Sequence, residues 1–266
     1  MEQIPSNTPV TESKPGPAGW VSVWMKAFTK PSEQTFIELT AGPEAVAKTA
    51  YIWIFIAGTV SGVIQALVSG IYSAMGTTPQ LPIPGLDQYI PQTTPGDPGT
   101  IVGSIVGGLC AAPVAGLVSV LFFAIGVAIT QWIAKMFGGT GSYEKLAYAI
   151  AAISLPYSLI TAVFSLLGAI PFVGICTGVI SLGLFFYVLY LQITAVKAVN
   201  HFGWGQAAGS VLIPGFVILF FCGCIVIGSL MVMGPMIGEV FSGINQGLAP
   251  EFELNKKILP TGRIFL

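Results

Sequence analysis

The chain has 266 residues, of which 54% are hydrophobic and only 8% carry a charge, whereas about a quarter of the residues of an ordinary soluble domain are charged. Ten basic and eleven acidic side chains give a formal net charge of −1, so the chain lacks the basic surface that a DNA or RNA partner requires. Composition therefore excludes a water-soluble fold and nucleic-acid binding. It predicts an all-α, polytopic protein embedded in a lipid bilayer.

Residues 1–44 form the predicted cytoplasmic N-terminal segment, which lacks the early apolar stretch of a cleavable signal peptide. Prolines among small polar residues predict disorder over 1–19. Apolar side chains then recur on one helical face, which predicts an amphipathic helix over 20–40 in the cytoplasmic headgroup layer, anchored by Trp20, Trp24 and Phe28. Alternatively, the same face packs on the membrane bundle.

Residues 45–238 form the predicted membrane domain, because they hold charge-free apolar stretches long enough for a bilayer core of about 30 Å. A hairpin at 168–171 divides the longest stretch into two spans. The domain is therefore expected to contain five transmembrane helices, at about 49–75, 106–134, 146–167, 173–196 and 208–237.

Prolines modify this scheme at several places. Pro113, Pro156 and Pro214 are expected to kink or break the spans that contain them. Six prolines exclude helix from the loop 76–100, whose apolar side chains are expected to cover the end of the bundle or to meet a partner.

The distribution of basic residues predicts the orientation. Seven of the ten lie before the first span or in the second and fourth connections, and the other three lie in the tail 239–266. The positive-inside rule then places the N-terminus in the cytoplasm, and five spans place the tail outside. The expected location is the cell (inner) membrane.

Reactive side chains are sparse, so no catalytic, cofactor-binding or metal-binding site is expected. The single histidine, His201, lies beside aromatic residues in the fourth connection and is expected at the membrane interface. Four cysteines without the close ligand pairs of a zinc site are expected to be buried thiols within the spans. These are Cys110, Cys176, Cys222 and Cys224.

Polar residues within the spans are uncharged, which disfavours ion-coupled transport. They are expected to form hydrogen bonds between helices, or, in the alternative, to line a path for a neutral solute. The residues concerned are Gln65, Gln131, Thr161 and Thr177.

Small residues provide the positive evidence for helix packing. Three Gly-x-x-x-Gly pairs are expected at helix contacts, where a missing side chain lets two backbones approach closely. The pairs are Gly58 with Gly62, Gly103 with Gly107, and Gly174 with Gly178. The steps Ala112/Gly116 and Ala147/Ala151 are weaker versions.

A glycine-rich run occupies the second cytoplasmic connection. It lacks the Gly-Lys-Ser/Thr of a nucleotide phosphate loop, and Ser142 is expected to cap the third span. Together with the Leu155-Pro156 step, this run resembles the Yip-one domain family, the Ypt/Rab-interacting proteins and their bacterial relatives. The residues that carry the resemblance are Gly138, Gly139, Gly141, Ser142, Tyr143 and Pro156.

The resemblance implies a non-enzymatic membrane protein, whose eukaryotic relatives bind small GTPases. The Asp-Leu-Tyr-Gly-Pro segment of those relatives is absent from residues 1–48, which favours the prokaryotic branch and argues against a GTPase partner. The function hypothesis is a scaffold that recruits or stabilises other membrane proteins or copies of itself. The alternative is a channel or facilitator for a neutral small solute.

Overall fold

The computed structural model describes residues 17–75, 97–168, 170, 173–217, 220, 223–224 and 227–228. Within these residues the secondary structure is entirely helical, which confirms the all-α class. The chain divides into two compact units, residues 1–214 and 215–266, and the helices described below belong to the first. Disorder was predicted over residues 1–19, but residues 17–19 form the start of a helix. Residues 1–16, most of the proline-rich loop and the C-terminal tail lie outside the described residues.

Four helices of the described residues are long and apolar enough to cross a membrane. They are α3 (Ala47–Ala74), α4 (Pro98–Met136), α5 (Tyr143–Gly168) and α6 (Val173–Asn200). The prediction of five spans is therefore wrong in number for the part of the chain that is described. Of the predicted fifth span, 208–237, the described residues are 208–217, 220, 223–224 and 227–228, all helical, and no spanning helix is found among them.

Prolines interrupt the helices less than predicted. Helix α4 continues through Pro113 and α5 through Pro156. Helix α4 also begins inside the predicted loop, with Asp97 as its cap: the Asp97 carboxylate accepts from the Thr100 N–H at 3.0 Å. Pro98 is compatible with this start because the first helical residue needs no N–H donor.

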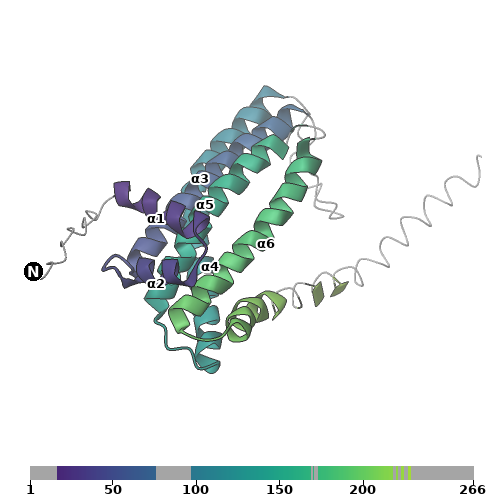
Figure 1. Ribbon diagram of the computed structural model, residues 1–266. Coiled ribbons are helices and arrows are strands. Elements are labelled where there is room, and N and C mark those ends of the chain that lie inside the picture. Colours follow the sequence, from purple (N-terminus) through teal and green to yellow (C-terminus); the bar gives the residue numbers. More distant parts are fainter. Residues whose placement is uncertain are drawn as a thin grey trace, which may run out of the picture. The chain divides into compact units, whose positions relative to one another are not determined.

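Helices α3, α4 and α5 lie side by side, and α6 packs on α5 (Figure 1). The buried side chains gather at the end of the bundle where α4 and α6 end. They come from the first turns of α3, from Leu146–Leu155 of α5 and from Val188–Asn200 of α6. We call this end, with the connections 137–142 and 200–203, the loop end.

The segment before α3 forms two helices, α1 (Pro17–Thr29) and α2 (Glu33–Ala41), where one helix over 20–40 was predicted. The break lies at Pro31, since the residue before a proline is pushed out of the helical region. Ser32 then caps α2, with its hydroxyl accepting from the Thr35 N–H at 3.1 Å. Both helices lie against the bundle: α1 contacts α5, and α2 contacts α5 and α6 (Figure 1).

Candidate functional site

The glycine loop, residues 137–142, connects α4 to α5 at the loop end. Gly138 adopts a φ of 89°, a left-handed conformation that glycine reaches without a steric penalty. The Gly139 N–H donates to the Ala134 carbonyl at 2.9 Å, which satisfies a carbonyl left open at the end of α4. Gly138 therefore terminates α4, whose last helical residue is Met136.

A buried polar network ties the glycine loop to α4 and α6. The Gln131 side-chain amide donates to the Gly141 carbonyl at 2.7 Å and to Asn200 Oδ1 at 3.0 Å. Asn200 Oδ1 also accepts from the Gly141 N–H at 3.2 Å, and Asn200 Nδ2 donates to the Val196 carbonyl at 3.1 Å. Gln131 and Asn200 are 3% and 1% exposed. Because both amides are satisfied, the network fixes one geometry of the loop.

Two glycines of the loop are required by this close fit. A Cβ atom on Gly139 would lie 2.7 Å from Asn200 Oδ1 and 2.8 Å from the Phe202 ring. On Gly141 it would lie 2.5 Å from the Val199 carbonyl oxygen. Any side chain at either position would therefore push the loop off α6.

Tyr143 joins three helices at the start of α5. Its hydroxyl donates to the Ala124 carbonyl of α4 at 3.2 Å and lies 2.8 Å from the Tyr51 hydroxyl of α3. The preceding Ser142 hydroxyl accepts from the Lys145 N–H at 3.4 Å. The family-like residues of this connection thus hold the loop end together, and sequence reasoning missed their partners Gln131 and Asn200 as a pair.

The contact between α3 and α4 consists of small residues on both helices. A Cβ atom on Gly62 would lie 3.1 Å from the Ala112 Cα, and one on Gly58 would lie 3.0 Å from the Gly116 Cα. Similarly, a Cβ on Gly108 would lie 2.5 Å from the Ala66 Cβ. Residue numbers rise along α3 as they fall along α4, so the two helices run antiparallel in near backbone contact.

The other predicted glycine pairs do not lie in this contact. Among the described residues, nothing lies within 4 Å of a Cβ built on Gly103, Gly107 or Gly178. A Cβ on Gly174 would lie 3.0 Å from the Gly168 carbonyl oxygen, across the connection between α5 and α6. Sequence reasoning missed Gly108, although the spacing of four to Ala112 and Gly116 was a usable signal.

The aromatic face of α1 packs on the bundle, as the alternative interpretation had it. Trp53, fully buried on α3, lies 5.9 Å from the Trp20 ring, 5.6 Å from the Trp24 ring and 4.8 Å from the Tyr148 ring. Phe28 meets Tyr187 of α6 at 5.5 Å between ring centroids. We call Trp20, Trp24, Trp53 and Tyr148 the aromatic cluster. The predicted interfacial position of the helix is not confirmed.

Ion pairs supplement the aromatic cluster. Lys26 of α1 pairs with Glu38 of α2 at 2.7 Å, and this hydrogen bond holds the pKa of Glu38 below its usual range. Lys197 of α6 pairs with Glu33 of α2 and lies 4.9 Å from the centre of the Trp204 ring. The two N-terminal helices are therefore joined to each other and to α6.

The polar residues proposed for a solute path do not share one site. Gln65 lines a cavity of about 570 Å³ between α3, α4 and α5, among small side chains such as Ser61, Ser154 and Ser158. Gln131 belongs to the loop-end network instead. The hydroxyls of Thr161 and Thr177 donate to carbonyls of their own helices.

The thiols differ from the prediction. Cys110 and Cys176 are exposed on α4 and α6, not buried in the bundle, because the outer faces of both helices are as apolar as their inner ones. Cys224 is also exposed, and Cys222 lies outside the described residues. His201 is exposed with a φ of 56°, at the end of α6. In the described ranges no three His, Cys, Asp or Glu side chains gather as metal ligands would.

The Yip1 domain family model matches residues 25–226, which include the glycine loop, the small-residue contact and both N-terminal helices from Met25 onward. No curated protein and no solved structure matches the chain. The match covers more than half of the sequence, so the chain belongs to the Yip1 domain family of multi-pass, non-catalytic membrane proteins.

Proposed function

We propose that this Yip1-domain chain is a non-enzymatic membrane scaffold that recruits or stabilises other membrane proteins, or copies of itself, through the outer faces of α4 and α6. The observation that supports this proposal is the division of its glycine steps. Gly58 and Gly62 are used inside the bundle, whereas Gly103, Gly107 and Gly178 face outward.

The outer face of α4 offers what a partner helix needs. Gly103 and Gly107 are exposed, and Val102 and Val106 beside them are 59% and 53% exposed. Lipid tails solvate valine as well as a partner helix does, so apolar exposure alone does not drive association. A glycine step adds a shallow groove in which a second helix can come into close van der Waals contact.

Helix α6 also has outward glycines, although they are five residues apart and so do not share one face. Gly178 and Gly183 have nothing within 4 Å of a built Cβ among the described residues. Ile175 and Val179 lie on the same side as Gly178 and are 74% and 69% exposed. The outward glycine step of α4 and the open Gly178 of α6 are thus the two places where a partner helix could approach closely.

Substitution at the outward steps tests the proposal. Gly107→Leu and Gly178→Leu are expected to reduce self-association or partner co-purification in mild detergent, without changing the thermal midpoint of the chain. Gly126→Leu is the matched control, because Gly126 is equally open on α4 but lies outside the pair. Association that survives both substitutions would contradict the proposal.

The serine-lined cavity supports a second candidate function, a facilitator for a neutral solute. This function needs a continuous polar lining, and Gln131, Thr161 and Thr177 lie away from the cavity that Gln65 lines. Flux of a neutral solute into proteoliposomes that is lost on Gln65→Leu would favour the facilitator over the scaffold.

We also propose that the loop end is cytoplasmic and that the membrane is a bacterial inner membrane. All lysines of the described residues lie at or near this end: Lys26, Lys30, Lys48, Lys135, Lys145 and Lys197. The positive-inside rule then orients the bundle. An impermeant reagent is expected to label Thr140→Cys only after lysis and Thr93→Cys in intact cells; the reverse pattern would invert the orientation.

A further inference from the structure

A second cavity lies at the loop end, outside the membrane-spanning contacts described above. It has a volume of about 330 Å³, at the lower end of the range of ligand pockets. Four segments that are distant in the sequence line it: α2, the glycine loop, the first turn of α5 and the end of α6. Its lining residues are Ile37, Thr40, Ala41, Thr140, Gly141, Ser142, Lys145, Ala198, Val199 and His201.

The charged and titratable side chains of the lining are basic. Lys145 and His201 come from α5 and from the end of α6, and no carboxylate lines the cavity. The ion pairs of the described residues join Lys26 to Glu38 and Lys197 to Glu33, so they involve neither Lys145 nor His201. The acidic side chains of α2 therefore have other partners, and Lys145 is the charged side chain of the lining; Glu144, its neighbour in the first turn of α5, does not line the cavity.

Hydrogen-bond donors complete the polar side of the cavity. The hydroxyls of Thr140 and Ser142 line it together with Lys145. The network of Gln131 and Asn200 holds the glycine loop in place, so these donors are preorganised. At the start of α5 the Lys145 N–H donates to the Ser142 hydroxyl and the Leu146 N–H to the Ser142 carbonyl, and the N-terminus of this helix of 26 residues adds partial positive charge.

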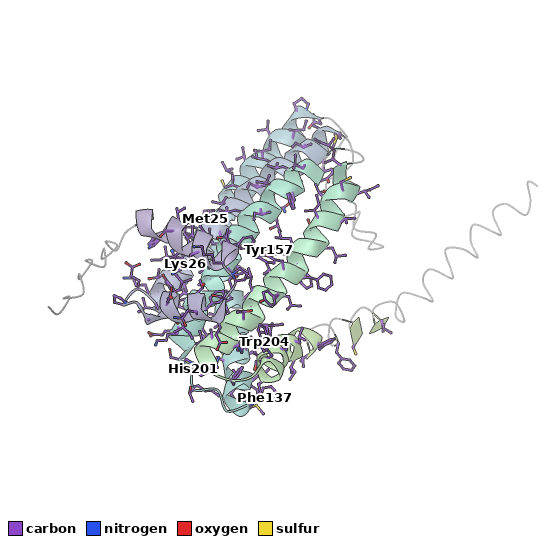
Figure 2. All side chains as sticks on the ribbon, in the orientation of Figure 1. Met25, Lys26, Phe137, Tyr157, His201 and Trp204 are labelled. Carbon is purple, nitrogen blue, oxygen red and sulfur yellow. The ribbon has the colours of Figure 1, made fainter. Side chains whose placement is uncertain are left out.

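The remainder of the lining is apolar. It consists largely of Ile37 and Ala41 of α2 and the buried Ala198 and Val199 of α6. A small anion with an organic substituent suits such a lining, because the charge can meet the basic wall while the substituent covers the apolar one. Figure 2 shows His201 at the same end of the bundle as Phe137, where the chain leaves the membrane-spanning helices.

We propose that this cavity binds a phosphate group, carried either by a phospholipid headgroup or by a free phosphate compound. Lys145 supplies the charge, as a compact ammonium that binds phosphate as a point charge. The His201 ring and the hydroxyls of Thr140 and Ser142 donate to the phosphate oxygens. The site is unlike a nucleotide phosphate loop, because its lysine follows the helix start instead of a Gly-Lys-Ser/Thr motif.

The test uses the full-length protein in neutral detergent and in nanodiscs. Binding of inorganic phosphate is measured by calorimetric titration, and retention of phosphatidylglycerol is measured by native mass spectrometry against a galactosyl diacylglycerol, whose headgroup has no phosphate. The variant is Lys145→Gln with His201→Asn, since asparagine tolerates the left-handed conformation of position 201. Lys135→Gln is the matched control, because Lys135 is exposed at the end of α4 and does not line the cavity.

The double variant is expected to lower affinity for its phosphate ligand at least about tenfold, the scale of one charge-assisted hydrogen bond, while the control binds like the wild type. Loss in the phosphatidylglycerol arm alone identifies a headgroup site, and loss in the inorganic phosphate arm identifies a site for a soluble phosphate. An unchanged thermal midpoint of the double variant shows that its fold is intact. Ser142→Ala is a milder second variant, and it is expected to lower the affinity for the same phosphate ligand as the double variant does. Equal binding by the double variant and the control in both arms would overturn the proposal.

Discussion

The α3–α4 contact and the loop end hold helices together by different means. Along α3 and α4, glycine and alanine let the two backbones come into near contact. At the loop end, the buried amides of Gln131 and Asn200 and the aromatic cluster do the same task. In the hydrocarbon core, lipid tails solvate apolar side chains as well as another helix does, so the association of α3 with α4 depends on steric fit. At the loop end, polar side chains can form complete hydrogen-bond networks that fix one geometry. A substitution in the α3–α4 contact should therefore lower stability according to the size of the new side chain. A substitution at the loop end should lower stability according to the hydrogen bonds that are lost.

Enlarging a glycine inside the α3–α4 contact should have the largest effect. Gly62→Leu places a side chain against the Ala112 backbone, which cannot rotate away, so we expect a loss of about 3 kcal/mol, at the upper end for overpacking. The thermal midpoint in detergent measures it. Gly103→Leu, on the open face of α4, should unfold like the wild type. Equal losses for both variants would remove the distinction between inner and outer glycines.

Removing the central amide of the loop end should have the next largest effect. Asn200→Leu removes the acceptor of the Gly141 N–H and one of the two acceptors of the Gln131 amide, which should cost about 2 kcal/mol. Adding Gln131→Leu should restore part of the loss, because an apolar pair replaces an orphaned amide. Chemical unfolding of the single and double variants gives both values. A double variant less stable than the sum of the two single changes would contradict this account of the network.

Loosening α1 should affect a smaller part of the molecule. Trp20→Glu with Trp24→Glu removes two rings from the aromatic cluster, each ring pair contributing about 1 kcal/mol, so hydrogen exchange over residues 17–29 should accelerate. Val21→Glu with Met25→Glu, on the exposed face, is the control and should leave exchange unchanged. If the control accelerates exchange equally, α1 is held by the headgroup layer as well as by the bundle.

The Lys26–Glu38 pair should have the smallest effect, because Glu38 lies at the surface. The folded-state pKa of Glu38 is lowered, so the pair stabilises the contact between α1 and α2 above the ordinary carboxyl pKa of 4.5 and is lost as pH falls through the folded value. Exchange over α1 should therefore increase slightly on acidification, and Glu38→Gln should abolish that part of the increase. Glu144→Gln, remote from the pair, should leave it in place.

The sequence predicted the helical class and the order of the apolar helices, because both follow from the absence of charge over long stretches. The sequence predicted the glycines of the loop as a motif, but it did not show why glycine is required there. Gly139 and Gly141 must lack a side chain because Asn200, which lies far along the chain, packs against them. Composition and local periodicity contain no information about such a partner.

The side chains whose surroundings could not be predicted from the sequence share a physical cause. An apolar helix face looks the same whether lipid or protein covers it, so Trp20 and Trp24 could not be assigned to the bundle, nor Cys110 to the surface. The spacing of Gly103 and Gly107 equals that of Gly58 and Gly62, yet only the latter pair meets a neighbour. A glycine step that packs against another helix is recognised by a matching series of small residues on that second helix. Here the series is Gly108, Ala112 and Gly116 of α4, which faces the glycines of α3.

The length of α4 has a consequence for the bilayer itself. Its 39 residues extend about 58 Å, nearly twice a hydrocarbon core of about 30 Å. Even at a tilt of about 40°, the steepest common for membrane helices, such a rod spans about 45 Å along the bilayer normal. With a hydrophobic mismatch of this size, either the bilayer thickens around the helix or an apolar end of the helix extends beyond the hydrocarbon core. A thicker membrane reduces the mismatch, so the protein is expected to partition into thicker membranes.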